Sequence, residues 1–194
     1  MATMATMTTA PTALIPIADG SEEIEAITLA DVLVRGGVEV TLASVGRKEA
    51  NIVTMSRGVR VQADVAIEAC VDRSFDLVVV PGGLPGANHL RDSEVLIELL
   101  RKQKDEDKLY GAICAAPAVV LHTHSLLPTA WTGYPGFEKQ VHGAAPSDER
   151  VVVDGHCVTS RGPGTAMEMG VKLVELLSGK EKAEQVAKGL LMSA

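Results

Sequence analysis

The sequence is poor in aromatic residues and in positive charge, and both shortages exclude classes of partner. Aromatic residues make up 3% of the 194 positions, so few side chains could stack on the bases of single-stranded nucleic acid. Acidic residues outnumber basic ones by 25 to 18, and the formal net charge is -7. Nucleic acids and anionic membranes both bind to basic patches. We therefore expect neither a nucleic-acid partner nor a membrane partner.

Cysteines are scarce and widely spaced as well. Cys70, Cys114 and Cys157 are odd in number and form no C-x-x-C pair, which argues against a disulfide framework and a zinc site. We expect no metal and a reducing, cytoplasmic location. Residues 1–11 lack the basic segment of a secretory signal, and we predict a disordered tail there, with an organelle address left open. No apolar stretch reaches the ~18 to 20 residues of a membrane span.

What the sequence does contain is an alternation of apolar β-type runs with helical patterns. Strands are predicted at 12–18, 38–45, 75–83 and 109–114, helices at 24–34, 92–107, 116–127, 164–180 and 181–191, and hairpins near Arg57-Gly58 and over 150–160. We expect Ser21 to cap the first helix. Alternating strands and helices predict a mostly parallel sheet with helices on both faces. We expect a single α/β domain over residues 12–192.

Cys114 ends one of the predicted buried strands, in "LYGAICAAPAVVL". Ligands of open α/β sheets bind beyond the carboxyl ends of the strands, so this thiol is placed as a nucleophile would be. A helix starting behind it would lower its pKa through backbone N–H groups and the helix dipole. A buried, inert cysteine explains the same position, because free cysteine is among the most buried residue types. Position alone leaves both readings open.

Glu25 and a glycine pair should reach the same edge of the sheet. On a helical wheel, Glu25 lies at the border of the apolar stripe, where burial would raise the pKa of its carboxyl and let it act as an acid. Gly82 and Gly83 close the strand "FDLVVVPGG" and could offer backbone N–H groups to an oxyanion, or serve only as a tight turn. No nucleotide-binding glycine motif and no H-E-x-x-H occurs, and we expect no cofactor.

Four stretches in this order resemble the Parkinson-disease protein deglycase (DJ-one) branch of the ThiJ/PfpI superfamily. They are "GSEEIEAITLADVLVRGGVEVTLAS", "FDLVVVPGG", "AICAAPAVVL" and "VTSRGPGTAMEMGVKLVELLSGK", and the resemblance covers roughly residues 12 to 192. It implies a flavodoxin-like three-layer sandwich and a homodimer. It also implies that Cys114 is the reactive cysteine and Glu25 its partner acid, with Gly82, Gly83 and the N–H of Ala115 on the oxyanion side.

The resemblance places further residues at the pocket or across the dimer interface. Arg57 matches an arginine that extends toward the neighbouring site, and the loop with Pro163 and Gly164 matches one near the pocket. Tyr134 stands where animal relatives have a histidine, which makes this chain more similar to the bacterial YajL-like and plant members at this position. Without that histidine, proton transfer would depend chiefly on Glu25. Gln62 stands nearest the place of a second, oxidation-prone cysteine.

The implied activity is that of a glyoxalase III-type enzyme or protein deglycase. Its substrates would be methylglyoxal, glyoxal or their early adducts, converted without glutathione, metal or organic cofactor. The alternative is a redox-sensing chaperone against oxidative stress, in which Cys114 is oxidised to a sulfinate that Glu25 stabilises. Protease activity is not expected, because Ala115 stands where the superfamily's proteases carry a histidine.

Overall fold

The computed structural model describes residues 9–46, 51–143 and 145–192. Most of the predicted tail, residues 1–8, lies outside these described residues, and the single-domain boundaries stay a prediction. No helix within the described ranges is long and apolar enough to cross a membrane.

The core of the fold is a seven-stranded sheet in the order β5-β2-β1-β6-β7-β9-β8. All neighbours are parallel except β8, which pairs antiparallel with β9 at one edge. The strands are β1 Thr12–Ile17, β2 Glu39–Ser44, β5 Val65–Ala66, β6 Leu77–Val80, β7 Leu109–Ile113, β8 Val151–Asp154 and β9 Cys157–Ser160. The predicted α/β class with a mostly parallel sheet is therefore confirmed.

The order of the main parallel strands locates the place where a ligand is expected. Counted along the chain, β1, β2, β6, β7 and β9 lie in the order 2-1-3-4-5, which is the flavodoxin-like arrangement. The order reverses between β1 and β6, and α/β proteins bind their ligands at such a reversal. Residues that follow β1 and β6 are thus the first candidates for a site.

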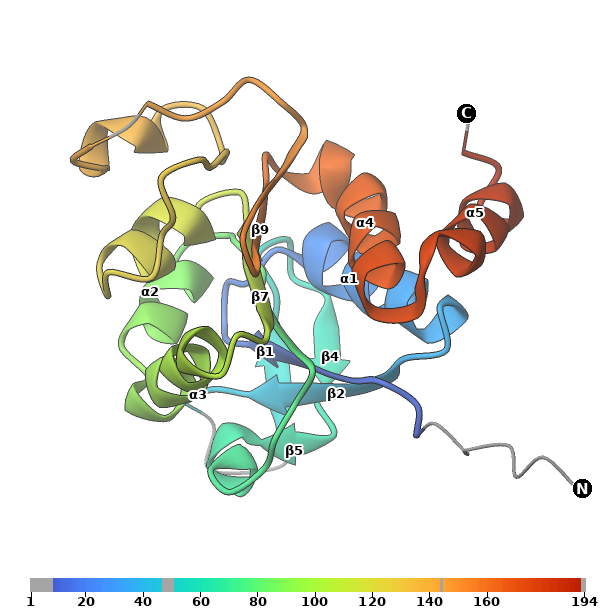
Figure 1. Cartoon of the computed structure of the whole chain (residues 1–194). Helices are drawn as coiled ribbons and strands as arrows, with labels where there is room; N and C mark the ends of the chain where they lie inside the picture. The colour runs from blue at the N-terminus through green and yellow to red at the C-terminus, as the bar shows by residue number, and fades with distance from the viewer. Residues whose placement is uncertain (1–8, 47–50, 144, 193–194) are drawn as a thin grey trace, which may run out of the picture.

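Helices cover both faces of the sheet (Figure 1). On one side α1 (Glu23–Arg35) packs on α4 (Ala166–Ser178), which carries α5 (Lys180–Gly189). On the other side lie α2 (Gly86–Arg91) and α3 (Glu94–Asp105), with the π-helix Pro117–His122 packed on α2. Single 3-10 turns occupy Ile67–Cys70, Phe137–Gln140 and Pro163–Thr165.

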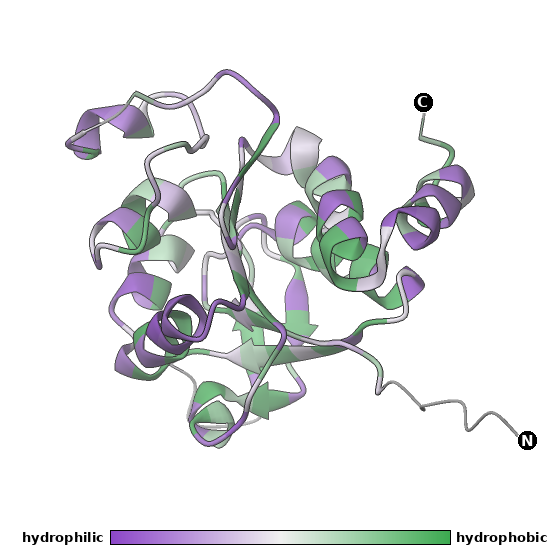
Figure 2. Cartoon of the chain, in the orientation of Figure 1, coloured by the Kyte–Doolittle hydropathy of each residue, from purple (hydrophilic) through white to green (hydrophobic). Residues whose placement is uncertain are grey.

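Apolar strands and the inner faces of the helices form one continuous core (Figure 2). All four residues of β6 are buried, as expected for a strand covered on both faces. Helix α3 is amphipathic: Leu96 and Leu100 are fully buried, whereas its charged side chains face solvent. Burial of strands on both faces leaves only their ends accessible.

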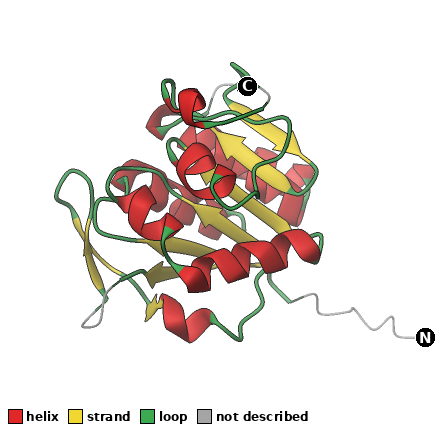
Figure 3. Cartoon of the chain, turned by 90° about the vertical axis from the view of Figure 1, so that its left-hand side faces the viewer, coloured by secondary structure: helices red, strands yellow, loops and turns green. Residues whose placement is uncertain are grey.

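The predicted hairpin near Arg57-Gly58 is confirmed as β3 (Ile52–Thr54) and β4 (Arg60–Gln62), which stand apart from the main sheet (Figure 3). The helix predicted over 116–127 was wrong in extent, because the π-helix ends at His122 and Ser125 adopts a left-handed φ of 59°. Helix α2 was not predicted.

Candidate active site

Cys114 follows β7 in a backbone conformation that side chains rarely adopt. Its φ is 65°, in the left-handed region that costs energy for a residue other than glycine. Two hydrogen bonds hold it there: Cys114 N donates to the Ser160 carbonyl at 2.9 Å, and the Cys114 carbonyl accepts from Tyr134 N at 2.8 Å. The turn fixes the thiol at the carboxyl edge of the sheet.

Polar groups from two other segments surround the sulfur. The backbone N–H groups of Gly83 and Ala115 form hydrogen bonds with the sulfur, and so does the side chain of Glu25. Cys114 itself is only 9% exposed. The structure thus brings together Cys114, Glu25, Gly83 and Ala115 at the predicted end of the sheet.

Glu25 lies in the first turn of α1 and is completely buried. Its Oε2 accepts a hydrogen bond of 2.7 Å from Gly82 N, whereas Oε1 has no hydrogen-bond partner among the described residues. Burial raises the pKa of Glu25 to about 7; the nearby Glu22 charge acts in the same direction, and hydrogen bonds from Gly82 and Cys114 oppose it. A buried carboxylate oxygen without a donor is costly, which also favours the protonated acid.

The pKa of Cys114 is raised in the structure, whereas the sequence predicted that a helix dipole would lower it. Burial raises the pKa of Cys114, and the charge and hydrogen bond of Glu25 raise it further. Only the Ala115 and Gly83 amides act in the predicted direction. The expected lowering was therefore wrong for this chain by itself, because burial and a neighbouring carboxylate outweigh two amide donors.

Glu25 and Cys114 consequently titrate as a pair. With two protons, the pair is a carboxylic acid beside a thiol; after one is lost, near pH 7, the remaining proton lies on Glu25 or on the sulfur, and burial of the thiol with the neighbouring Glu25 charge favours the sulfur. When that proton sits on Glu25, the sulfur is a thiolate next to an acid and two amide donors. In that arrangement a nucleophile and an acid lie side by side.

Gly82 and Gly83 form hydrogen bonds with different partners. A Cβ on Gly82 would lie 2.7 Å from the Cys114 Cβ, and one on Gly83, where φ is +85°, would lie 2.5 Å from the Gly20 carbonyl. Gly82 was predicted as an oxyanion donor, but its N–H is engaged by Glu25. Gly83 and Ala115 are the predicted donors whose N–H groups face the sulfur.

The remaining predicted pocket residues lie around this centre. Tyr134 is half exposed, and its ring lies over Gly162, 3.2 Å from where a Cβ would stand. Pro163 and Gly164 line a surface groove with Ile24 of α1. Arg57 is exposed at the tip of the β3–β4 hairpin, where its N–H donates to Glu23. Within this one chain, no hydrogen bond joins Arg57 to the described residues around Cys114.

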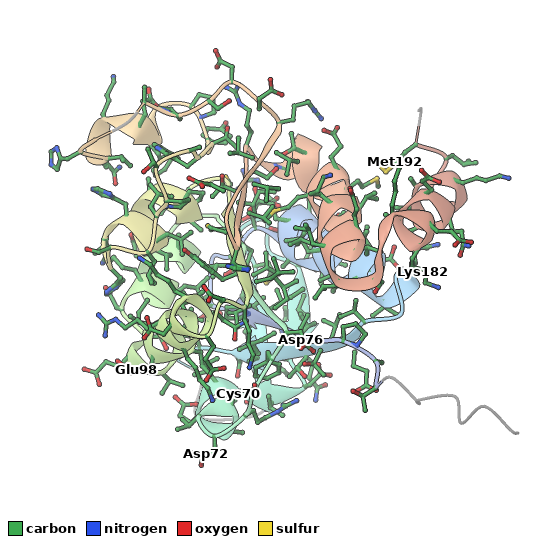
Figure 4. The ribbon with its side chains drawn as sticks, viewed as in Figure 1. Cys70, Asp72, Asp76, Glu98, Lys182 and Met192 are labelled. Carbon is green, nitrogen blue, oxygen red and sulfur yellow. The ribbon has the colours of Figure 1, made fainter. Side chains whose placement is uncertain are left out.

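Histidines and the other cysteines lie elsewhere. Hydrogen bonds of His89 and His124 run to backbone carbonyls of Asp19 and Arg91, respectively, and His122 lies against His142. Cys70 is buried in its 3-10 turn at the lower end of the view in Figure 4. Across the described part of the chain, no group of three or more His, Cys, Asp or Glu side chains could hold a metal ion.

One residue was missed by the sequence reasoning. Glu22, not Ser21, caps α1: its Oε2 accepts from Glu25 N at 2.8 Å, while Ser21 Oγ accepts from Ala18 N. Glutamate is not among the preferred N-cap residues, so its run of acids indicated only first-turn charges. The available signal was three glutamates in four positions, Glu22 to Glu25.

Known proteins share the fold of this chain. The model of the DJ-1/PfpI family matches residues 11–176. The structure resembles that of oxidized Toxoplasma gondii DJ-1, with a TM-score of 0.91 and 45% identity, over 95% of this chain and 100% of that chain. The chain is 38% identical to "Glutathione-independent glyoxalase DJR-1.2" of Caenorhabditis elegans, covering 93% of this chain and 95% of the relative.

A plant relative is longer than this chain. "Protein DJ-1 homolog B" of Arabidopsis thaliana is 43% identical over 183 residues, which is 94% of this chain but only 41% of the relative. The chain thus spans less than half the length of that relative.

Proposed function

The chain belongs to the DJ-1/PfpI family, and from this premise we propose that it is a glutathione-independent glyoxalase of the glyoxalase III type that also deglycates early adducts. The observation that carries the proposal is the Cys114 sulfur, which interacts with the Glu25 carboxyl and with the N–H groups of Gly83 and Ala115. One nucleophile, one buried acid and two amide donors are the groups that this chemistry needs.

The reaction starts when the Cys114 thiolate attacks the aldehyde carbon of methylglyoxal. The C=O bond becomes a hemithioacetal oxyanion, which the Gly83 and Ala115 amides stabilise. Glu25 gives its proton to this oxyanion and then, as the carboxylate, takes the proton from the same carbon. It returns that proton to the adjacent carbon through an enediol, while the hydroxyl proton passes from the first oxygen to the second. The product is a hydroxyacyl thioester, which water hydrolyses to lactate with recovery of the thiol. The overall change adds one water and needs no redox partner.

Early adducts of dicarbonyls enter the same route. A hemiaminal or hemithioacetal on a protein releases its amine or thiol and leaves the aldehyde for Cys114. Tyr134 offers no imidazole, so proton transfer depends chiefly on Glu25. Its buried carboxyl, with a pKa raised to about 7, is suited to giving and taking a proton near neutral pH.

The proposal includes a homodimer. Ile24 and Ile27 are 54% and 41% exposed on α1, and Ile24 continues into the groove with Pro163, Met167 and Met192. An exposed apolar face of this kind is typical of a protein interface. A second copy packed there would shield it, with the exposed Arg57 of each hairpin directed to the other copy's site. We also propose a cytoplasmic location for this dimer.

A redox-sensing role is the second candidate, and the same sulfur environment favours it. A sulfinate on Cys114 would carry a negative charge next to the Gly83 and Ala115 N–H groups and the protonated Glu25. The two roles use one thiol and can coexist.

Lactate formation tests the glyoxalase proposal. Methylglyoxal is supplied without glutathione or metal, and lactate is measured with a chiral assay for wild type, Cys114→Ala and the control Cys157→Ala. We expect turnover in the wild type and the control and none above buffer in Cys114→Ala. Wild-type rates in Cys114→Ala would overturn the mechanism.

A further inference from the structure

Three hydrogen bonds link Glu22, Glu25 and Gly82 into a closed ring at the start of α1. Glu22 N donates to the Gly82 carbonyl at 3.0 Å, Gly82 N donates to Glu25 Oε2 at 2.7 Å, and Glu25 N donates to Glu22 Oε2 at 2.8 Å. The ring ties α1 to the turn after β6, across the point where the strand order reverses. Rotation of the Glu25 carboxyl away from Gly82 would open it.

Glu22 is an unusual residue for this position. N-caps are usually Ser, Thr, Asp or Asn, whose short side chains reach the helix amides at small entropic cost. Glu22 is also only 7% exposed, and within the described residues it forms no salt bridge. A buried charge without a cation costs stability. Departures from local rules of this kind are expected at functional sites.

The negative charge of Glu22 acts on the carboxyl of Glu25. Burial is the main cause of the raised pKa of Glu25, and the negative charge of Glu22 adds to it. Two other carboxylates, on α1 and α4, have partners of their own. Glu23 of the same helix binds Ser56 and the Arg57 amide, and Glu168 of the packed helix α4 pairs with Arg150. From β7, Cys114 is the titratable group that meets Glu25.

We propose that Glu22 is a positioning residue for the Cys114–Glu25 pair: it joins the Glu25 backbone to the Gly82 turn and, by its buried charge, shifts the shared proton toward Glu25. With the proton on Glu25, the sulfur is a thiolate. Without the Glu22 charge, an ionised Glu25 beside a neutral thiol becomes more favourable. Glu22 thus sets how much of the singly protonated pair is reactive.

Alkylation of Cys114 by iodoacetamide tests this, followed by mass spectrometry from about pH 5 to pH 9. The inference rests on the same pair as the proposed function, but alkylation needs no turnover, so it can be judged even if glyoxalase activity is absent. In the wild type, reactivity should rise as the pair loses its first proton, near pH 7. Glu22→Gln keeps an oxygen for the Glu25 amide and removes the charge. We expect the midpoint of its pH profile to fall by roughly 0.5 pH unit or more and its plateau rate by about threefold. Both changes would come from the loss of the same interaction free energy between the Glu22 charge and Glu25.

Two further variants separate charge from capping. Glu22→Asp keeps both the charge and a cap, and should restore the wild-type midpoint. Ser93→Ala removes the cap that Leu96 N uses on α3, remote from the site, and should lower the melting temperature without moving the midpoint. A wild-type midpoint and plateau in Glu22→Gln would overturn the proposal and leave Glu22 as a helix cap only. A shift in Glu22→Asp equal to that in Glu22→Gln would overturn it as well.

Discussion

Cys114, which follows β7, and Cys157, which begins the neighbouring β9, are both buried but differ in what surrounds the sulfur. Cys157 begins β9 in regular strand geometry, and burial raises its pKa to about 12, with a hydrogen bond from Tyr110 opposing. Cys114 follows β7 with a left-handed φ, two amide donors and a buried carboxyl beside it. Burial is common to both thiols, so the proposed reactivity of Cys114 rests on its polar partners and not on its burial.

Mild oxidation is the strongest way to break this comparison. Peroxide should add two oxygen atoms to Cys114 and leave Cys70 and Cys157 as thiols, because the sulfinate gains amide donors and an acid only at Cys114. Mass spectrometry of proteolytic peptides reads all three sites from one sample. Equal oxidation of the three thiols would mean that the surroundings of Cys114 confer no selectivity.

A methyl group beside the thiol should have the next largest effect. Gly82→Ala would put a Cβ 2.7 Å from the Cys114 Cβ and 3.0 Å from Ala115 N, so the turn must shift. We expect a loss of lactate formation of about 100-fold and a destabilisation of about 1–3 kcal/mol. Gly189→Ala is the matched control, because a Cβ there meets nothing within 4 Å. Wild-type kinetics in Gly82→Ala would show that the close packing of Gly82 on Cys114 is dispensable.

Much of this architecture could be predicted from periodicity. Alternating strands and helices predicted the parallel sheet, and the apolar runs ending in Gly82 and Cys114 predicted that these residues meet at one edge. Such patterns work because burial on both faces leaves a direct mark on the sequence. Helix α2 shows no comparable apolar pattern, since its six residues include a glycine and few apolar side chains.

The chemistry of the site was less predictable than its location. The direction of the Cys114 pKa depends on the balance of burial, the Glu25 charge and two amides, and this balance needs coordinates. The same holds for Gly82, whose N–H was free to bind either an oxyanion or Glu25 until the structure placed Glu25 at 2.7 Å. The role of Glu22 arises from a ring of contacts that no spacing in the sequence reveals.

The most direct test of the central claim, that Glu25 is a buried acid holding its proton near neutral pH, is the free energy of unfolding against pH for wild type and Glu25→Gln. A folded pKa of about 7 against 4.5 unfolded means that the folded state binds more protons between these values. The contribution of the Glu25 proton to the free energy of unfolding should therefore be fully present below pH 4.5. The free energy of unfolding of the wild type should then fall relative to that of Glu25→Gln as pH rises to 7, by about 3 kcal/mol in total. A difference between the two proteins that stays constant from pH 4 to pH 8 would contradict the account.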